Sequence, residues 1–342
     1  MIKIEISEDK WKQIEEKHLR FVEKHILKSG RGEIVFRDQN VQSRMAYLTR
    51  EYQLNLKEEV FITRNLEKYA LTADELFPDE YMKKTYPKEC DTAQGINKKR
   101  RDCVNSILDA FGYTSKFSKK EGLKIAEEES WGRHEYLNML DVHVCPYCGR
   151  QYITSYRIKK KRWATADIDH YYPKAVFPLL SMNLYNMLPS CSICNSRLKL
   201  DKIKRREQVH LHPYKDSSDC IKFNVELDSV DALYRTNQDA IHLEAKVIQE
   251  KEKSKNSIGI FSLNEIYRNH KGDAYDVISK MDLYSEEKFN QIFDKDFPNL
   301  FSDYEELEHC MFDFLSKEYL EEPLVKMKKD IYEQVKSIIS FQ

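Results

Sequence analysis

The chain has 342 residues and a net charge of −1, with 56 Lys and Arg against 57 Asp and Glu. Hydrophobic residues make up 41% of it, and only 9 Gly and 9 Pro are present, which excludes a disordered or fibrous protein. The charged start at residues 1–5 carries no apolar signal region, and no run of about 18 apolar residues follows. We therefore expect a cytoplasmic protein with no membrane span.

Helices are predicted to dominate the N-terminal part. Ser7 is a candidate N-cap for a helix over residues 8–28, which Ser29 and Gly30 would end. A short apolar run at 33–36 is typical of a strand. Apolar periodicity predicts further helices, over residues 42–53, 57–70, 95–111 and 119–141. The run from Lys98 to Arg101 is either a solvated basic face or a contact with a nucleic-acid backbone.

The C-terminal part begins with two segments in which apolar and polar residues alternate, at 221–227 and 240–248, and these are predicted strands. Helices are predicted after them, over residues 257–270, 273–281, 286–294, 303–317 and 321–340. The expected fold class is α+β and mainly helical. We divide the chain into a helical N-terminal region at 1–130, a central core at 131–215 and a C-terminal region at 216–342.

Two CxxC pairs bracket the central core. A reducing cytoplasm disfavours disulfides, so cysteines at this spacing are better explained as metal ligands. The pairs supply four thiolates for one tetrahedral Zn²⁺, from Cys145, Cys148, Cys191 and Cys194. Such an ion has no open coordination position and is structural. A redox role fits poorly, and the other cysteines are expected to be buried thiols, namely Cys90, Cys103, Cys220 and Cys310.

Positive charge is concentrated in the same region. Residues 143–206 carry 13 Lys and Arg against 3 Asp and Glu, while the remainder of the chain is acidic. A site that holds a polyanion requires this distribution. The candidate nucleic-acid contacts are Arg157, Lys159, Lys160, Lys161, Arg162, Arg197, Lys199 and Lys202. The run at 157–162 is either a solvated hairpin tip or a hairpin that contacts phosphates.

The chemistry is expected in the segment between the two CxxC pairs. A strand at 163–172 ends in Asp169 and His170, a loop follows, a second strand covers 186–189, and a short helix begins at Asn195. The zinc would bring Asp169 and Asn195 together. Their hard oxygen atoms suit Mg²⁺ or Mn²⁺, and the neighbouring His170 is placed to take a proton from water.

These residues resemble the HNH, or ββα-metal, endonuclease family in its zinc-bearing branch. The run from Asp167 to His170 also resembles the HNH domain of CRISPR effector nucleases. The resemblance implies that His170 is the general base and Asp169 a metal ligand. It further implies that Asn186 holds the hairpin and orients the histidine, and that Asn195 is the second metal ligand. The similarity covers about residues 145–213.

A narrower similarity concerns the bacterial anti-phage HNH effectors of the Septu and retron kind, which are encoded with an ATPase partner. It is carried by residues 171–174, by Phe177 and Pro178, by Tyr185 and Asn186, and by residues 211–214. It implies a defence effector that cleaves DNA, with a possible ATPase partner protein. Cleavage of RNA, or a zinc-stabilised nucleic-acid-binding module without catalysis, are the alternatives.

Other polar residues near the site have simpler explanations. Asp167 lies one repeat before Asp169 on the same face of the strand, where it either supports the hairpin or provides a third metal ligand. The remaining histidines are expected in the core or on the surface, namely His134, His143, His210, His212 and His270.

Overall fold

The computed structural model describes residues 1–28, 32–158, 161–200, 202–228, 240–284, 286–297 and 300–339. Contacts within the chain divide it into two compact units. The first unit comprises residues 5–142 and 153–209, and the second comprises residues 1–4, 143–152 and 210–342. These limits do not coincide with the expected ones near residues 130 and 215, because residues 143–152 have their contacts with the second unit.

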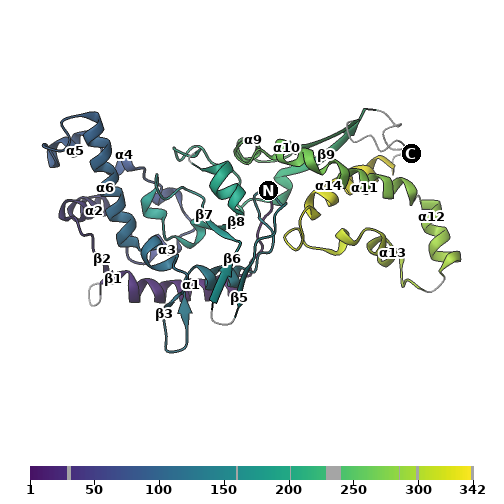
Figure 1. Ribbon diagram of the computed structural model, residues 1–342, viewed down its shortest axis with the longest axis horizontal. Helices are drawn as coiled ribbons and strands as arrows, with labels where there is room; N and C mark the ends of the chain where they lie inside the picture. The colour runs from purple at the N-terminus through teal and green to yellow at the C-terminus, as the bar shows by residue number, and fades with distance from the viewer. Residues whose placement is uncertain are drawn as a thin grey trace. The chain divides into compact units, whose positions relative to one another are not determined.

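The fold is α+β and mainly helical, as predicted, and its sheets are small and antiparallel. The helices of the first unit are α1 Glu8–His25, α2 Gln39–Glu51, α3 Glu59–Ile62, α4 Ala73–Leu76, α5 Asp79–Thr85, α6 Ala93–Phe111 and α7 Arg133–Leu140. Its short hairpins pair β1 Leu27–Lys28 with β2 Glu33–Ile34, and β3 Leu123–Lys124 with β4 Ser130–Trp131. Figure 1 shows these elements along the chain.

Caps fix the starts of α1 and α2 and the end of α6, but α1 ends at His25 and not at the predicted residue 28, because Leu27 and Lys28 pair in β1. The Ser7 hydroxyl accepts from the backbone N–H of Lys10 at the start of α1. Asp38 caps α2 in the same way, which starts that helix three residues earlier than periodicity alone suggests. Gly112 ends α6 in the left-handed conformation, with φ at 70°. Local backbone chemistry therefore fixes these boundaries.

Two predicted helices are wrong. The segment 57–70 holds only α3 and the short η1 Glu67–Tyr69, because Thr63 is extended and its hydroxyl accepts from the N–H of Asn65. The segment 119–141 becomes the β3–β4 hairpin followed by α7. Here Ile125 and Ala126 both donate to the carbonyl of Glu129, which closes a turn in place of a helix.

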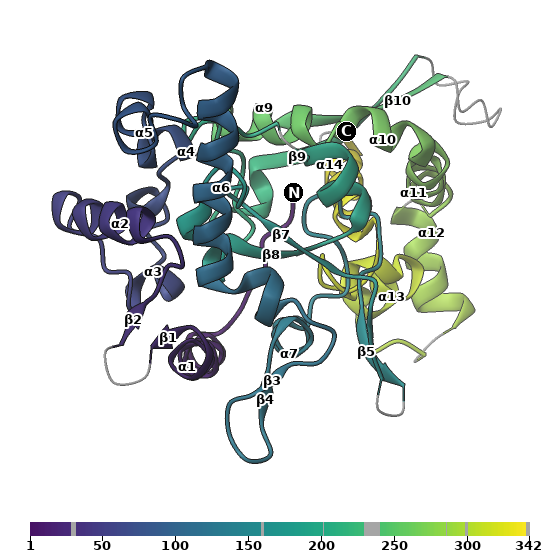
Figure 2. The same ribbon diagram turned by 60° about the vertical axis from the view of Figure 1, so that its left-hand side comes forward.

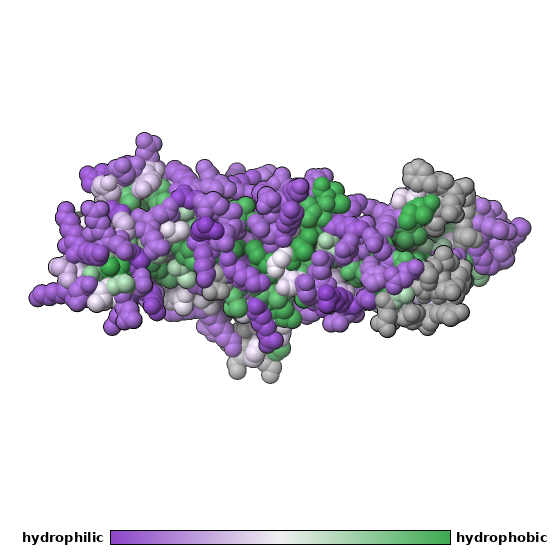
Figure 3. Space-filling model, turned by 90° about the horizontal axis from the view of Figure 1, so that it is seen from above, coloured by the Kyte–Doolittle hydropathy of each residue, from purple (hydrophilic) through white to green (hydrophobic). Residues whose placement is uncertain are grey.

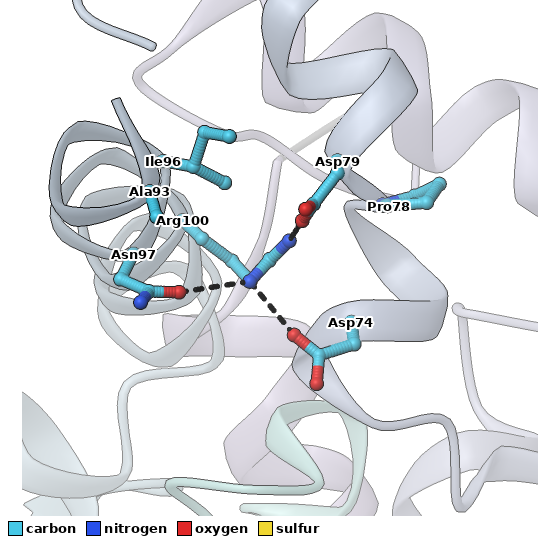
Figure 4. Close-up of a pocket in the computed structure, with 7 residues that line it drawn as sticks. All are labelled: Asp74, Pro78, Asp79, Ala93, Ile96, Asn97 and Arg100. Carbon is cyan, nitrogen blue, oxygen red and sulfur yellow. Dashed lines mark hydrogen bonds and ion pairs between the residues drawn. The ribbon is translucent and has the colours of Figure 1, made fainter. Parts of the chain in front are cut away.

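The basic run on α6 is not a uniform solvated face, because Arg100 is buried. Its Nε donates to the Phe77 carbonyl at 2.8 Å, and its guanidinium pairs with Asp74 and Asp79 and donates to the side-chain oxygen of Asn97 (Figure 4). The α4–α5 segment is thereby held against α6, beside which it lies in Figure 1. Arg100 thus has a structural role and is not presented to a nucleic-acid backbone.

The centre of the chain supplies two hairpins. Strand β5 Ser155–Ile158 pairs with β6 Lys161–Ala164, and β7 Asp167–His170 pairs with β8 Met187–Ser190. The predicted strand at 163–172 is therefore divided between β6 and β7. Between β7 and β8 the chain forms η3 Pro178–Leu180 and η4 Leu184–Asn186, and η5 Cys194–Lys199 follows β8 as a π-helix. Figure 2 shows the β3–β4 and β5–β6 hairpins extending away from the helices of the first unit.

Helices of the first unit hold the loop between β7 and β8. Asn183, fully buried, donates to the carbonyls of Val60 and Thr63 at 2.9 and 3.1 Å. Tyr136 of α7 donates to the carbonyls of Leu184 and Met187. His18 of α1 lies 2.9 Å from the carbonyl of Met182 and accepts from Trp131. The N-terminal helices therefore form the support of this loop, a role that their sequence did not indicate.

The second unit is built on one hairpin. Strand β9 Ile221–Leu227 pairs in register with β10 Ile241–Val247, which confirms both predicted strands. The helices that follow are α9 Lys251–Ile260, α10 Leu263–Tyr267, η8 Arg268–His270, α11 Lys271–Leu283, α12 Glu286–Gln291, η9 Ile292–Asp296, α13 Tyr304–Met311, η10 Asp313–Ser316 and α14 Val325–Ile339. The predicted helix at 257–270 starts earlier and breaks at Ser262, whose φ is 47°. Residue 340 lies outside the described residues.

Side chains of α14 cover the outer edge of β9. The Gln334 amide accepts from the N–H of Val225 and donates to its carbonyl, both at 2.9 Å. Asp330 accepts from the N–H of Phe223 and pairs with Lys326, and this ion pair is almost completely buried. Helix α11 packs beside α14. The hairpin thus gains a polar partner along one edge and an apolar cover from the helices.

One face of the molecule can be judged by its hydropathy. Hydrophilic side chains predominate on the face drawn in Figure 3. Within the part of the chain that the structure describes, no helix combines the length and the apolar character needed to cross a bilayer.

The loop support can be tested at Asn183. Asn183→Ala should lower the free energy of unfolding by about 3–5 kcal/mol, because it leaves the carbonyls of Val60 and Thr63 and the N–H groups of Tyr185 and Asn186 without their partner. Urea denaturation measures this change. Asn105→Ala, on the exposed face of α6, is the matched control and should change stability by less than about 0.5 kcal/mol. Equal effects of the two substitutions would contradict the role given to Asn183.

Candidate metal centre and active site

The four cysteines of the two CxxC pairs come together. The sulfur atoms of Cys145, Cys148, Cys191 and Cys194 all lie within 4.8 Å of one another, and all four residues are buried. Tetrahedral zinc with Zn–S bonds of about 2.3 Å needs sulfurs roughly 3.8 Å apart, so the cluster suits such an ion. These cysteines could therefore bind a metal such as zinc, which agrees with the spacing of the pairs.

Each CxxC turn has the backbone geometry that brings two sulfurs to one side. Gly149 donates to the carbonyl of Cys145 at 2.8 Å with φ at 63°, a conformation that glycine adopts without strain. At the other pair, the N–H of Cys194 donates to the sulfur of Cys191. The Tyr267 hydroxyl fixes the first turn by donating to the carbonyl of Cys148 at 2.6 Å. Of the remaining cysteines, Cys310 is exposed, in contrast to the buried position expected for it.

Strand β7 carries the acidic residues of the second candidate site. Asp169 pairs with Leu188 and His170 with Met187 across the β7–β8 hairpin. Alternation along the strand places Asp167 and Asp169 on the same face. Asp169 is 5% exposed and its Oδ2 accepts a charged hydrogen bond from Lys199. This carboxylate is therefore buried next to a cation.

His170 is buried in a fixed orientation. Its Nε2 lies 2.9 Å from the carbonyl oxygen of Ser181, and because a carbonyl only accepts, Nε2 carries the proton. The lone pair is then on Nδ1. Burial and the ammonium of Lys174 lower the pKa of His170 to about 3. The ring of Tyr113 meets the imidazole edge-on at 4.5 Å. Near neutral pH His170 is thus a neutral imidazole with one free proton-accepting nitrogen.

Asn186 closes the loop that holds His170. Its side-chain oxygen accepts from the N–H of Tyr172 at 2.8 Å, and its amide donates to the carbonyls of Tyr172 and Leu180 at 3.1 and 2.9 Å. Leu180 directly precedes Ser181, the residue whose carbonyl fixes the imidazole. Asn186 therefore links the two ends of the loop and sets the position of the Ser181 carbonyl.

Asn195 lies against the first acidic residue of β7. Its side-chain nitrogen donates to Oδ2 of Asp167 at 3.3 Å, and Asp167 also lies 3.6 Å from the guanidinium of Arg133. The sequence paired Asn195 with Asp169 as joint metal ligands. In the structure the hydrogen bond of Asn195 goes to Asp167, whereas Asp169 is paired with Lys199, so the two predicted ligands have different partners.

Lys199 is not at the surface, in contrast to the expected phosphate contact. Its side chain is 1% exposed, and its ammonium donates to Asp169 and to the carbonyl of His170. Burial lowers the pKa of Lys199, and the Asp169 carboxylate opposes this shift. The sequence identified Lys199 as a basic residue of the site. Its inward direction, toward Asp169, depends on the turn of η5.

The other basic candidates have different outcomes. Arg197 and Lys202 are exposed. Lys159 and Lys160 lie outside the described residues. Arg157, Lys161 and Arg162 are placed on the β5–β6 hairpin by its register. On that hairpin Tyr156 and Trp163 lie opposite each other and are 44% and 45% exposed, and the Lys120 ammonium lies 4.5 Å from the Trp163 ring. Sequence analysis had not singled out these aromatic residues.

The remaining histidines have local partners. His134 lies 3.2 Å from the hydroxyl of Ser155, and His210 is buried 2.9 Å from the carbonyl of Leu211. His270 accepts from Arg150 and pairs with Asp273, while His143 is exposed and His212 is buried. These positions agree with core or surface roles.

Comparison of the chain with models of protein families, with curated proteins and with solved structures found no significant match.

The cysteine cluster predicts a metal content. Purified protein should contain about one zinc ion per chain, and Cys191→Ser should lower this content to near zero and destabilise the fold, because a structural zinc contributes directly to folding. Metal analysis of dialysed protein and thermal unfolding measure the two effects. Cys310→Ser removes an exposed sulfur and should leave both unchanged. Zinc retained in full by Cys191→Ser would rule out the four-sulfur site.

Burial of His170 predicts a pH dependence of stability. Its pKa is about 3 in the folded protein against an ordinary 6.5, so the unfolded chain binds the proton first as pH falls. The free energy of unfolding should therefore decrease from pH 6.5 downward, by up to about 1.4 kcal/mol per pH unit for this group. His170→Gln should have a smaller slope by that amount between pH 6 and pH 5 in urea denaturation. Identical slopes would show that His170 titrates normally.

Proposed function

We propose that the protein is a metal-dependent HNH-type endonuclease that hydrolyses phosphodiester bonds of DNA. The observation that carries the proposal is the state of His170. A neutral imidazole is held at Nε2 by the Ser181 carbonyl, so that Nδ1 accepts a proton, and it directly follows the carboxylate Asp169. A fixed, neutral imidazole that adjoins a candidate cation ligand in the sequence supports hydrolysis by an activated water.

The oxygen atoms near η5 fit a hard divalent cation. Asp169 and Asn195 would hold Mg²⁺ or Mn²⁺, and Asp167 on the same strand face is available as a third oxygen donor. The buried Lys199 ammonium at Asp169 is evidence that this place accommodates positive charge. When bound, the divalent ion would neutralise charge on the phosphate and on the leaving oxygen. A hard cation of this kind is bound by oxygen atoms, so it requires no sulfur or imidazole ligand.

The protein residues would perform the proton transfer. Nδ1 of His170 takes a proton from water, and the water oxygen attacks phosphorus while the bond to the 3′-oxygen breaks, as the family resemblance implies. The products would be a 5′-phosphate and a 3′-hydroxyl. Asn186 contributes indirectly, since it fixes the loop whose Ser181 carbonyl holds the imidazole. The leaving 3′-oxygen takes a proton from solvent, and the protonated imidazole returns to solvent the proton that it took from water.

The four cysteines would bind a structural zinc. Four thiolates fill a tetrahedral coordination sphere, so this ion has no position for water or substrate. Its effect would be to fix the turn at Cys191 and Cys194, and hence the start of η5, from which Asn195 and Lys199 extend. Zinc and catalytic cation would thus have separate tasks.

Binding of DNA is supported by charge and by the β5–β6 hairpin. The segment 143–206, which contains the candidate site, has an excess of basic residues, and the exposed Arg197 follows Asn195 by two residues. On the hairpin, five of the six residues at 157–162 are basic, and the exposed Tyr156 and Trp163 provide flat rings for stacking on bases. RNA would bind to the same surface, and the cleavage assay described below compares DNA with RNA.

The narrower similarity supports a role as a cytoplasmic anti-phage effector, with an ATPase as possible partner. The residues that carry this similarity also have a structural role in the fold. Tyr172 and Phe177 stack edge to face at 5.0 Å, and Pro178 is buried at the start of η3. These side chains build the loop around His170. The second unit is available for a partner protein, since the candidate catalytic side chains belong to the first unit.

A zinc-stabilised binding module without catalysis is the second candidate. The observation in its favour is the Lys199 contact, because Asp169 is already neutralised by an ammonium. Such a module would bind nucleic acid equally well without a divalent ion and without His170. Activity measurements separate the two functions.

The decisive experiment is plasmid cleavage by purified protein. Wild type should cleave with Mg²⁺ or Mn²⁺ and not with EDTA. His170→Ala should lower the cleavage rate by roughly 10²–10⁴-fold, because the general base is lost. Binding to the plasmid, measured by gel shift, and zinc content should not change.

His242→Ala is the matched control, because His242 is an exposed histidine of the second unit and its loss should leave cleavage intact. Plasmid binding without cleavage by the wild type would favour the binding module, and equal cleavage by wild type and His170→Ala would contradict the role of His170 as the base. Preferential cleavage of single-stranded or structured RNA in a parallel assay would redirect the proposal from DNA to RNA.

A further inference from the structure

Lys199 is a buried cation with two acceptors in the candidate active site. Its ammonium donates to Oδ2 of Asp169 and to the backbone carbonyl of His170. It therefore touches the proposed metal ligand and the residue of the proposed base at once. A lysine is rarely buried to this extent unless its charge is compensated.

The backbone directs this side chain inward. Element η5 is a π-helix, whose turn is wider than that of an α-helix, and such turns are frequent at functional sites. It ends immediately after Lys199, where Leu200 takes φ of 39° and ψ of −117°. A leucine in this region is strained. The chain thus departs from regular helical geometry at the residue that places the ammonium on Asp169.

We propose that Lys199 is a tethered counter-cation, which occupies the cation position beside Asp169 and leaves it when a divalent ion binds. The proposal rests on the proposed function in one respect, namely that Asp169 is a ligand of the divalent ion. An ammonium and a doubly charged ion cannot both lie within bonding distance of one carboxylate without strong repulsion. The affinity of the site for the metal is therefore reduced by the contact that Lys199 makes.

Displacement of Lys199 gives the site a means of coupling metal to substrate. Once released from Asp169, the ammonium is a mobile cation at the end of η5, close to the exposed Arg197. A phosphate group would stabilise it there, so nucleic acid would favour the state that binds metal. By linkage, metal would raise the affinity for nucleic acid by the same factor. The free protein would remain in the lysine-paired form.

A purely structural ion pair is the competing explanation, and the second unit contains an example. Lys326 contacts both oxygens of Asp330, at 3.0 and 2.9 Å, and Asp330 also accepts from the N–H of Phe223. The Asp330 carboxylate is fixed by a strand and a helix. Asp169 instead precedes His170 in β7 and shares a face of that strand with Asp167. The Lys199 ammonium is thus held by one carboxylate and one backbone carbonyl, both of which are oxygen donors of the kind that a hard cation takes.

Binding of Mn²⁺ to zinc-loaded protein without nucleic acid tests the proposal. Electron paramagnetic resonance of free Mn²⁺ gives the dissociation constant. Lys199→Met and Lys199→Gln should bind Mn²⁺ at least about tenfold more tightly than wild type, because the competing charge is gone. Lys204→Met removes an exposed charge from the segment that follows η5 and should match wild type. Asp169→Asn should abolish the binding that Lys199→Met strengthens.

Labelling of the wild-type protein provides a second measurement that needs no folded variant. In zinc-loaded protein without added Mn²⁺, Lys199 should resist acetylation by an amine-reactive ester, and mass spectrometry should detect its acetylation at saturating Mn²⁺. Lys199 that remains protected while Mn²⁺ is bound would overturn the proposal, as would unchanged Mn²⁺ affinity in both Lys199 variants. If wild type also cleaves plasmid with Mn²⁺, these results leave the nuclease function in place. Absence of both Mn²⁺ binding and cleavage in every variant would remove both proposals.

Discussion

The chemistry of the candidate site depends on one hydrogen bond, from Nε2 of His170 to the carbonyl of Ser181. It selects the tautomer of the imidazole and its orientation. The loop that carries the Ser181 carbonyl is irregular, and buried polar side chains hold it in place. Asn186 spans the loop from inside, Asn183 ties it to the backbone of Val60 and Thr63, and Tyr136 holds its end. Each of these side chains replaces a backbone partner that a regular sheet or helix would have supplied.

Charge compensation is the second constraint on this region. Asp169 and Lys199 are both removed from water, and each would be costly to bury without the other. The result is a site that is electrostatically complete in the free protein. If Asp169 is a metal ligand, as proposed, a divalent ion has to displace the Lys199 ammonium before it can bind.

The sequence predicted the elements whose signals are local, and it missed those that depend on distant contacts. Ser7, Asp38 and Gly112 fix helix ends through their own backbone geometry, and β9 and β10 follow from alternation. The CxxC spacing predicted a cluster of four sulfurs, which the structure contains. The predicted helix at 57–70 was wrong because the chain is extended at Thr63, whose hydroxyl accepts from Asn65. The carbonyls of Val60 and Thr63 accept instead from Asn183, at least 120 positions away. The partners of Asp169 and Asn195 were also missed. The direction of Lys199 is set by a π-turn, which has no sequence signature.

The side-chain amide of Gln334 has a consequence for how this protein behaves in a crowded solution. A hairpin of two strands has two open edges, and an open edge is a template on which another chain can add a strand. At Val225 the amide already makes both bonds that an incoming strand would make, and Asp330 takes the N–H of Phe223. Two side chains of helix α14 thus occupy the backbone groups at the edge of β9. They block the addition of a strand from another chain, without a third strand in the sheet.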